Sequence, residues 1–183
     1  MYYLLASTVK AVCALFAQGL SHKDIKGDNF VFLDGQSVDG ELLGLIDYGY
    51  CINASASSSN KSGTAQYSPP EAFWEGEGTI NTEKFDVFSL GVLFITLIFQ
   101  DWAFYKKGVG YKCINDDAYR EFFMNETLSL DDRLKFFSKK WSKTCYSKDA
   151  RILILIARMI DYNPINRPSL DKVLTEPSIQ QYL

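Results

Sequence analysis

The chain has 183 residues, of which 47% are hydrophobic and 22% are charged, and its formal net charge at pH 7 is -3. This length suits a single domain with a hydrophobic core, and the composition excludes a chain that is disordered throughout. The weak negative charge gives no reason to expect nucleic acid or a membrane surface as a partner.

The first predicted element is a helix at residues 2–20. Its larger apolar side chains keep helical spacing, and Gly19 stands where glycine commonly ends a helix. The segment also resembles the apolar part of a secretory signal, but Lys10 and Gln18 interrupt it and no basic stretch precedes it. A helix that packs on the core is therefore the prediction.

Two short strands are predicted after the polar stretch "HKDIKGDN" at 22–29. They are "FVFLD" at 30–34 and "LLGLID" at 42–47. The residues between them, "GQSVDGE", are typical of a turn. The two segments are therefore predicted to pair as a hairpin with a long loop.

A polar loop and a buried helix come next. Residues 48–70 have no strong periodicity, and "NASASSSNKSG" at 53–63 is small and polar, as in an exposed loop. Residues 82–100 are apolar on nearly all sides. We expect them to form a helix through the centre of the domain, with Thr82 as its N-cap.

The rest of the chain is predicted to be mostly helical, so the fold class is mainly α with a small β-hairpin. The elements expected after residue 100 are a loop with Gly108 and Gly110, helices near 116–124 and within 129–140, a helix at 148–161 capped by Ser147, and a short helix at 170–176 capped by Ser169.

Neither a membrane span nor a cysteine-based site is predicted. The longest apolar runs, 87–99 and 152–160, fall short of the roughly 20 residues that a spanning helix needs. There is no CxxC pair, and no histidine near the cysteines completes a zinc site. We expect reduced thiols in an intracellular, cytoplasmic protein at Cys13, Cys51, Cys113 and Cys145.

Five short motifs resemble signatures of the eukaryotic protein kinase family. "HKDIKGDN" at 22–29 is similar to H-R-D-L-x-x-x-N, "DYG" at 47–49 to D-F-G, and "SPPE" at 68–71 to A-P-E. "DVFSLG" at 86–91 and "NPINRPS" at 163–169 resemble two further family segments. Each motif alone is weak, but five in this order leave little room for chance. The resemblance implies a protein kinase domain at 1–183, with a catalytic loop at 22–29 and an activation segment at 47–71.

The resemblance also implies the chemistry of the site. Phosphoryl transfer needs a carboxylate near the attacking hydroxyl, a cation near the phosphate and oxygen ligands for magnesium. By resemblance, Asp24 accepts or orients the hydroxyl proton, and Lys26 contacts the γ-phosphate of ATP. Asn29 and Asp47 hold Mg²⁺. Val31 forms the floor beneath the adenine ring.

Plainer explanations exist for some of these residues. Asp24 and Asn29 could serve only as turn or capping residues, which is the commoner role of such side chains in loops. Val31 fits a generic position in a core strand equally well. These alternatives stay open on the sequence alone.

The expected substrate is a serine or threonine of a protein. A lysine two residues after the catalytic aspartate resembles the serine/threonine branch of the family. The segment "GTAQYSPPE" at 63–71 points the same way, because its Thr64 matches a threonine that contacts the aspartate and the lysine of the catalytic loop. Thr64 is therefore counted with the catalytic residues.

Other residues are expected to be structural. His22 is a packing residue in this family, and Tyr48 and Gly49 complete the triplet that Asp47 begins. Tyr48 replaces phenylalanine and keeps an aromatic ring for packing. The remaining expectations are that Glu71 pairs with Arg167 and that Asp86 accepts hydrogen bonds from the backbone of the catalytic loop.

Control by phosphorylation is expected to be weaker than in most relatives. Lys23 replaces the arginine that grips a phosphorylated residue of the activation segment, and lysine offers only a point charge. The candidate phosphosites, which a solvated linker explains as well, are Ser57, Ser58, Ser59 and Ser62.

The resemblance covers the C-terminal lobe of a kinase. The Gly-rich loop, strand lysine and helix glutamate of an N-terminal lobe are expected to be absent, and "GVGYK" at 108–112 does not replace them. Phosphate transfer by this chain alone should therefore be weak, and a separate N-terminal lobe or partner chain would complete the ATP site. A silent binding or scaffold module is the alternative function. A small-molecule kinase is disfavoured by the segment at 63–71.

Overall fold

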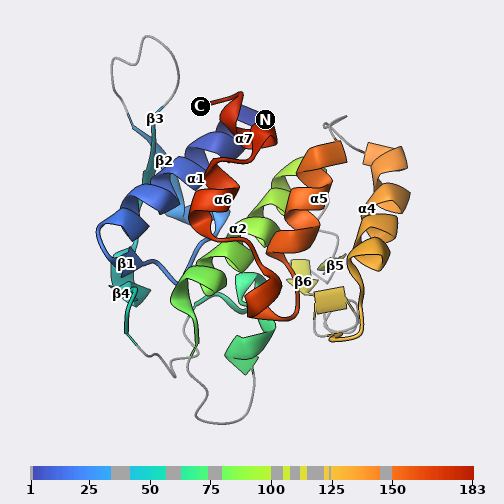
Figure 1. Cartoon of the computed structure of the whole chain (residues 1–183), viewed down its shortest axis with the longest axis horizontal. Coiled ribbons are helices and arrows are strands. Elements are labelled where there is room, and N and C mark those ends of the chain that lie inside the picture. The colour runs from blue at the N-terminus through green and yellow to red at the C-terminus, as the bar shows by residue number, and fades with distance from the viewer. Residues whose placement is uncertain are drawn as a thin grey trace.

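In a computed structural model of the chain, the structure describes residues 2–33, 42–56, 63–73, 80–99, 105–107, 112–114, 122–123, 125–144 and 150–183. Helices make up most of this part, and short strands lie beside them (Figure 1). The mainly helical fold with a small hairpin is confirmed. Within these ranges, no helix combines the length and the apolar character that crossing a bilayer requires.

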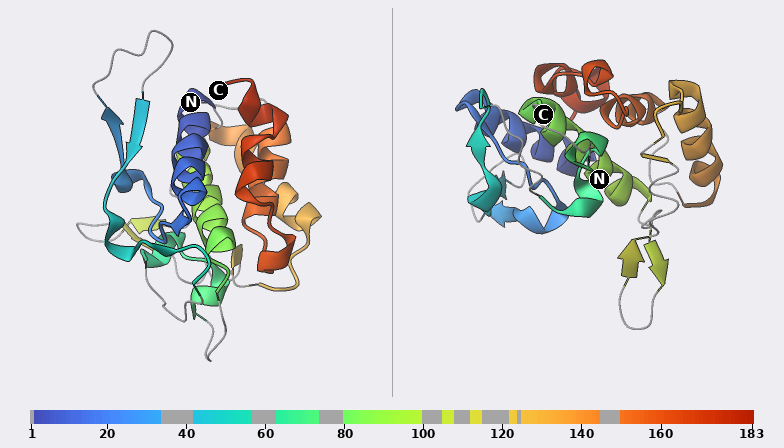
Figure 2. Two further views of the ribbon diagram at one scale, coloured as in Figure 1. Left: turned by 60° about the vertical axis from the view of Figure 1, so that its left-hand side comes forward. Right: turned by 90° about the horizontal axis from the view of Figure 1, so that it is seen from below.

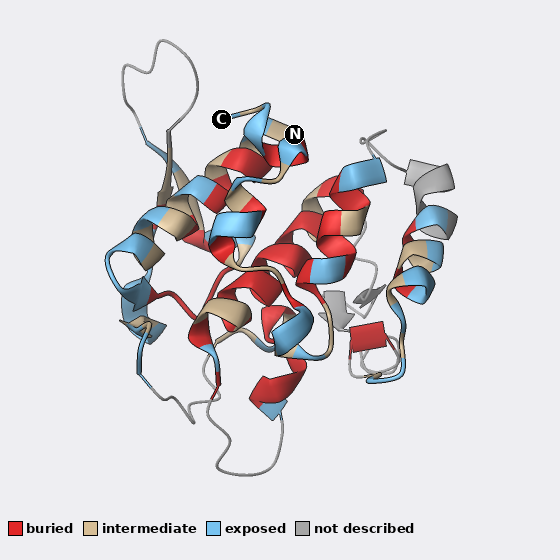
Figure 3. Cartoon of the chain, in the orientation of Figure 1, coloured by how far each residue is buried: buried red, intermediate tan, exposed pale blue. Residues whose placement is uncertain are grey.

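The centre of the domain is α2 (Thr82–Phe99), and the prediction of a buried central helix is confirmed. It packs against α1 (Tyr2–Ala17), α4 (Leu130–Thr144) and α5 (Ala150–Met159). Most of its residues are buried, as the red ribbon in Figure 3 shows. Gly91 allows the close approach of the end of α5, because a Cβ at Gly91 would lie 3.0 Å from Cβ of Met159 and 2.7 Å from Cγ2 of Ile160, the next residue.

The prediction that Thr82 caps α2 is wrong. The side-chain Oδ1 of Asn81 accepts a hydrogen bond from the backbone N–H of Lys84 at 3.0 Å, which is the contact of an N-cap. The hydroxyl of Thr82 instead donates to the carbonyl of Ala54 at 3.0 Å. Asparagine and threonine both favour N-caps, so the sequence could not decide between neighbours.

The predicted hairpin is present as β2 (Phe30–Leu33) paired with β3 (Leu42–Leu45), in antiparallel register from Phe30 with Leu45 to Leu33 with Leu42. It stands beside α1, which the left-hand view of Figure 2 shows. The hairpin matters for the site because the loop at 22–29 leads into β2 and Asp47 follows β3.

Two further antiparallel ladders were not predicted. One pairs β1 (Leu20–Ser21) with β4 (Ile52–Asn53), and the other pairs β5 (Tyr105–Lys107) with β6 (Lys112–Ile114). The second falls where a loop was expected, and it projects from the helical body in the right-hand view of Figure 2. Strands of two or three residues are too short for alternating hydrophobicity to reveal.

The C-terminal helices largely follow the prediction. Ser169 caps α6 (Leu170–Leu174), since its Oγ accepts a hydrogen bond from the N–H of Lys172 at 3.3 Å. The short α7 (Pro177–Gln180) was not predicted, and α4 extends beyond the expected 129–140. Ser147 and most of the helix expected near 116–124 lie outside the described residues.

Candidate active site

Asp86 in α2 fixes the backbone of the loop at 22–29. Its buried carboxylate accepts hydrogen bonds from the backbone N–H groups of His22 and Lys23, both at 2.8 Å, and from the hydroxyl of Ser21 at 2.7 Å. Burial raises the pKa of the Asp86 carboxyl, and the hydrogen bonds oppose this shift. The contact expected between Asp86 and the loop backbone is present, and it ties the loop to the central helix.

His22 joins this loop to the segment that carries Asp47. Its Nδ1 accepts a hydrogen bond from the backbone N–H of Asp24 at 3.2 Å, so the proton of a neutral ring lies on Nε2. Nε2 is 3.0 Å from the carbonyl oxygen of Ile46 and donates to it. His22 is fully buried, with its ring centre 5.6 Å from that of Tyr48. It therefore packs, as expected, and also bridges two segments.

Asp24 gathers the side chains of Lys26 and Thr64 around its carboxylate. Oδ2 accepts from Nζ of Lys26 at 2.7 Å, and Oδ1 accepts from the hydroxyl and the backbone N–H of Thr64 at 2.7 and 2.8 Å. Nζ of Lys26 also donates to Oγ1 of Thr64 at 2.9 Å. The carboxylate, the cation and the hydroxyl thus form one closed cluster across the loop and the segment at 63–73.

The pKa of Asp24 lies below its ordinary value. Burial alone would raise it, but the hydrogen bonds from Lys26 and Thr64 and the charge of Lys26 favour the carboxylate and outweigh burial. Asp24 is therefore ionised at neutral pH, and it is a weak proton acceptor.

Asn29 and Asp47 offer oxygen atoms from neighbouring segments. The side-chain amide nitrogen of Asn29 donates to the carbonyl and the carboxylate of Asp24 at 2.8 and 3.2 Å, which directs the amide oxygen away from Asp24. The backbone N–H of Ile46 donates to the carbonyl of Asn29 at 2.9 Å and so brings Asp47 alongside. Asp47 is exposed and has a left-handed backbone with φ 61°.

The side chains of Asn29 and Asp47 carry oxygen atoms of the kind that magnesium prefers. Magnesium prefers oxygen ligands, keeps several waters and commonly binds through one or two protein groups plus phosphate oxygens. In the part of the chain that the structure describes, no three His, Cys, Asp or Glu side chains gather into a metal cluster. One carboxylate and one amide oxygen match the small number of protein ligands that magnesium commonly takes. Val31 lies nearby in β2, half-buried and paired with Gly44.

Lys23 points into the interior. Its side chain is 0% exposed, and its ammonium lies 4.5 Å from the centre of the Phe85 ring. Burial lowers the pKa of Lys23, while the charges of Asp86 and Glu71 act in the opposite sense. The candidate phosphosites Ser57, Ser58, Ser59 and Ser62 lie outside the described residues.

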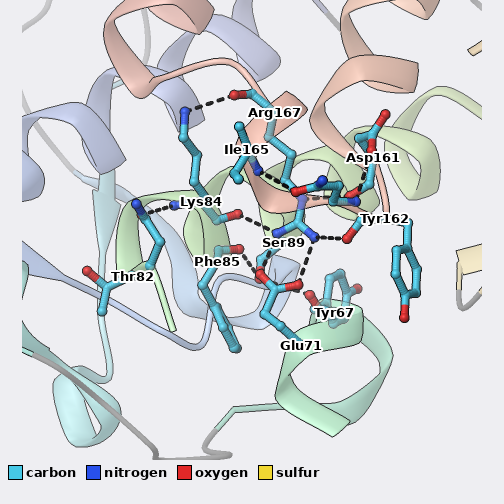
Figure 4. A network of polar contacts seen from close by, with 12 residues as sticks. Tyr67, Glu71, Thr82, Lys84, Phe85, Ser89, Asp161, Tyr162, Ile165 and Arg167 are labelled. Carbon is cyan, nitrogen blue, oxygen red and sulfur yellow. Dashed lines mark hydrogen bonds and ion pairs between the residues drawn. The ribbon is translucent and has the colours of Figure 1, made fainter. Parts of the chain in front are cut away.

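Glu71 and Arg167 form a buried ion pair, which is the contact expected from the sequence (Figure 4). The two terminal nitrogens of Arg167 donate to the two carboxylate oxygens of Glu71 at 2.5 and 2.8 Å. The other donors bond the backbone carbonyls of Asp161, Lys84 and Tyr162. All five N–H groups of Arg167 are therefore used, which secures the segment at 63–73 to the helical body.

Sequence reasoning gave Gly63 no role, although it precedes Thr64 directly. Its φ of +113° lies in a region that L side chains rarely adopt, and a Cβ there would be 2.5 Å from the carbonyl oxygen of Lys23. The absence of a side chain lets the segment at 63–73 lie against the loop at 22–29. The position of Gly63 directly before Thr64 was the one sign in the sequence that it could matter. Its backbone angle could not be read from the sequence.

Substitution of Gly63 by alanine should lower the free energy of unfolding by about 2–3 kcal/mol, because a strained backbone angle combines with a clash. Gly19→Ala is the matched control, since Gly19 also has a positive φ, of +76°, but has nothing within 4 Å of the added Cβ. That variant should lose only about 1 kcal/mol. Urea denaturation of both variants separates the cost of the strained backbone angle from the cost of the clash. Equal losses in the free energy of unfolding would rule out the clash with Lys23.

Comparison with known proteins identifies relatives across nearly the whole chain. The family model described as the protein kinase domain matches residues 2–179. An Aurora kinase of Schizosaccharomyces pombe is 30% identical over 173 residues, which cover 94% of this chain and 41% of that protein. The serine/threonine-protein kinase chk-2 of Caenorhabditis elegans is 29% identical over 174 residues, covering 94% of this chain and 32% of that protein.

A third relative gives the same picture. The serine/threonine-protein kinase pim-2 of Danio rerio is 27% identical over 174 residues, which cover 94% of this chain and 46% of that protein. The chain thus spans less than half the length of each of these three relatives. Because the family model covers almost every residue, the chain belongs to the protein kinase family.

Proposed function

We propose that the chain is the C-terminal lobe of a serine/threonine kinase, which transfers the γ-phosphate of ATP to hydroxyl groups of protein substrates. The observation that carries this proposal is the cluster of Asp24, Lys26 and Thr64, whose polar atoms lie 2.7–2.9 Å apart. Phosphoryl transfer depends mainly on positioning and on charge neutralisation, and this cluster combines a carboxylate, a cation and a hydroxyl.

Asp24 is the catalytic residue that faces the substrate hydroxyl in this proposal. Because its pKa is lowered, it removes a proton poorly from a hydroxyl that has not begun to react. It acts by orienting the hydroxyl oxygen toward the phosphate and accepting the proton once the new bond has begun to form.

Lys26 supplies positive charge on the other side of the same carboxylate. Its Nζ donates hydrogen bonds to Asp24 and Thr64 at 2.7 and 2.9 Å. The side chain of Lys26 is 20% exposed. A lysine held in this way can contact the γ-phosphate without a search through many rotamers. Thr64 is the positioning residue that fixes the pair.

Asn29 and Asp47 would hold Mg²⁺, which supplies charge neutralisation at the phosphates when bound. Asn29 is prepared for this role by its two hydrogen bonds to Asp24, which hold its amide nitrogen and leave its amide oxygen directed away from Asp24. Val31 would lie beneath the adenine ring. The magnesium ligands and the catalytic carboxylate are thereby linked through one side chain, that of Asn29.

Two observations favour serine and threonine over tyrosine as acceptors. Lys26 and Thr64 form the pair by which the sequence resembles the serine/threonine branch, and their contact is 2.9 Å. Two of the relatives described above are named as serine/threonine-protein kinases. We also propose that residues 1–183 alone transfer phosphate weakly and that an N-terminal lobe or partner chain completes the ATP site.

The test measures phosphate transfer from γ-labelled ATP with Mg²⁺ to three peptides that differ only in a serine, threonine or tyrosine acceptor. It is done with residues 1–183 and with the longest chain that the gene encodes. Label that appears on serine and threonine but not on tyrosine, and that does not appear when EDTA is present during the reaction, supports the proposal. If neither chain transfers phosphate and calorimetry detects no magnesium-dependent ATP binding, the kinase proposal fails in favour of a silent binding module.

A further inference from the structure

The side chain of Tyr48 makes a hydrogen bond that the phenylalanine of the family motif could not make. Its hydroxyl donates to the backbone carbonyl of Leu45 at 2.7 Å. Leu45 is buried, ends β3 and is paired with Phe30 in β2. The hydroxyl therefore ties the turn after β3 to a fixed point of the hairpin.

The turn that this bond closes contains Asp47 in a strained conformation. Asp47 has φ 61° and ψ 72°, in the left-handed region, which costs free energy for a residue other than glycine. The Oδ1 of Asp47 accepts from the N–H of Gly49 only at 3.4 Å, which is long for a hydrogen bond. This contact is therefore a weak restraint on the backbone of Asp47, whereas the neighbouring Ile46 is held by the backbone carbonyl of Asn29.

Ring packing is a weak restraint on the same turn. Tyr48 is 54% exposed, and His22 is its aromatic neighbour, with the ring centres 5.6 Å apart and the planes tilted by 56°. A half-exposed ring with one such neighbour gains little from burial. The bond from the hydroxyl to Leu45 is shorter and better defined than either of these contacts.

We propose that the hydroxyl of Tyr48 is a positioning group that holds Asp47 in its left-handed conformation and so sets the place of its carboxylate as a magnesium ligand. This inference rests on the proposed function, in which Asp47 binds Mg²⁺. Tyr48 touches neither substrate nor metal in this assignment and acts through the backbone of Asp47.

The test compares Tyr48→Phe with Tyr50→Phe. Tyr50 lies in the same turn and is 46% exposed, and its hydroxyl makes no hydrogen bond to the described part of the chain. Each substitution removes one hydroxyl from a tyrosine of similar exposure. The readouts are the amide hydrogen exchange of residues 47–49 without nucleotide, and the Mg²⁺ concentration that half-saturates binding of a non-hydrolysable ATP analogue.

Tyr48→Phe should raise the half-saturating Mg²⁺ concentration by about 3- to 10-fold, the range that one hydrogen bond supports, and should speed the exchange of residues 47–49. The melting temperature should change little, and Tyr50→Phe should match the parent. The inference is overturned if the parent binds the magnesium complex and the two variants behave alike. The measurements use the longest chain that the gene encodes; if that parent binds no magnesium complex at all, the proposed function is overturned and, with it, the role assigned to Asp47.

Discussion

Replacing Asp24 with asparagine should lower the rate of phosphate transfer by about 10²- to 10⁴-fold, the range that a positioned acid or base contributes. Asparagine keeps the shape of the side chain, but it cannot accept all the bonds that Asp24 accepts from Lys26 and Thr64. It also loses the negative charge that holds Lys26. The measurement is kcat/KM with a serine peptide, together with the thermal melt.

Asp28→Asn is the matched control for this variant. Asp28 lies in the same loop, in the short helical turn at 27–29, and its side chain is exposed. The same chemical change there should leave the rate and the melt near those of the parent. An Asp24→Asn variant that keeps a tenth or more of the parental rate would remove Asp24 from the proposed mechanism, because an effect below about tenfold is too small for this role.

Replacing Arg167 with methionine should lower the free energy of unfolding by about 3–5 kcal/mol, the cost of removing one partner of a buried ion pair. The loss leaves the buried carboxylate of Glu71 without its hydrogen-bonded partner and three backbone carbonyls without their donor. Arg167 also packs 4.9 Å from the centre of the Phe88 ring, so methionine keeps part of the apolar contact. Urea denaturation at constant pH measures the change.

Arg158→Met is the control, because Arg158 is exposed on α5 and its loss should cost less than about 0.5 kcal/mol. Arg167→Lys adds a sharper comparison. Lysine keeps the charge but has three donors in place of five, so this variant should fall between the parent and Arg167→Met. If Arg167→Lys is as stable as the parent, the positive charge stabilises the protein and the additional hydrogen bonds of the guanidinium group do not.

Sequence motifs predicted the contacts that join distant segments better than they predicted local geometry. The pairing of Glu71 with Arg167, the contact of Asp86 with the loop backbone and the approach of Thr64 to Asp24 were all expected from the family pattern and are present. A motif preserves residue types whose partners lie far away in the chain. It therefore carries information that periodicity alone does not.

Two kinds of feature could not be predicted from the sequence: backbone angles, and the position of a helix cap where two adjacent residues could both supply it. The cap of α2 lies on Asn81 and not on Thr82, because two good capping residues stand side by side. The close approach of Gly63 to the carbonyl of Lys23 depends on a positive φ, and the residue type alone does not show which φ a glycine adopts. The interior position of Lys23 was missed because the arginine of the family pattern suggested a cation that faces a phosphate.

The first turns of α2 hold three separate segments. Asp86 bonds the loop at 22–29, Ser89 donates to the carbonyl of Tyr67 at 2.8 Å, and the carbonyl of Lys84 accepts from Arg167. A helix buried on nearly all sides can melt only together with the domain around it. Heat should therefore separate these three segments from one another only when the whole fold unfolds, in a single cooperative event.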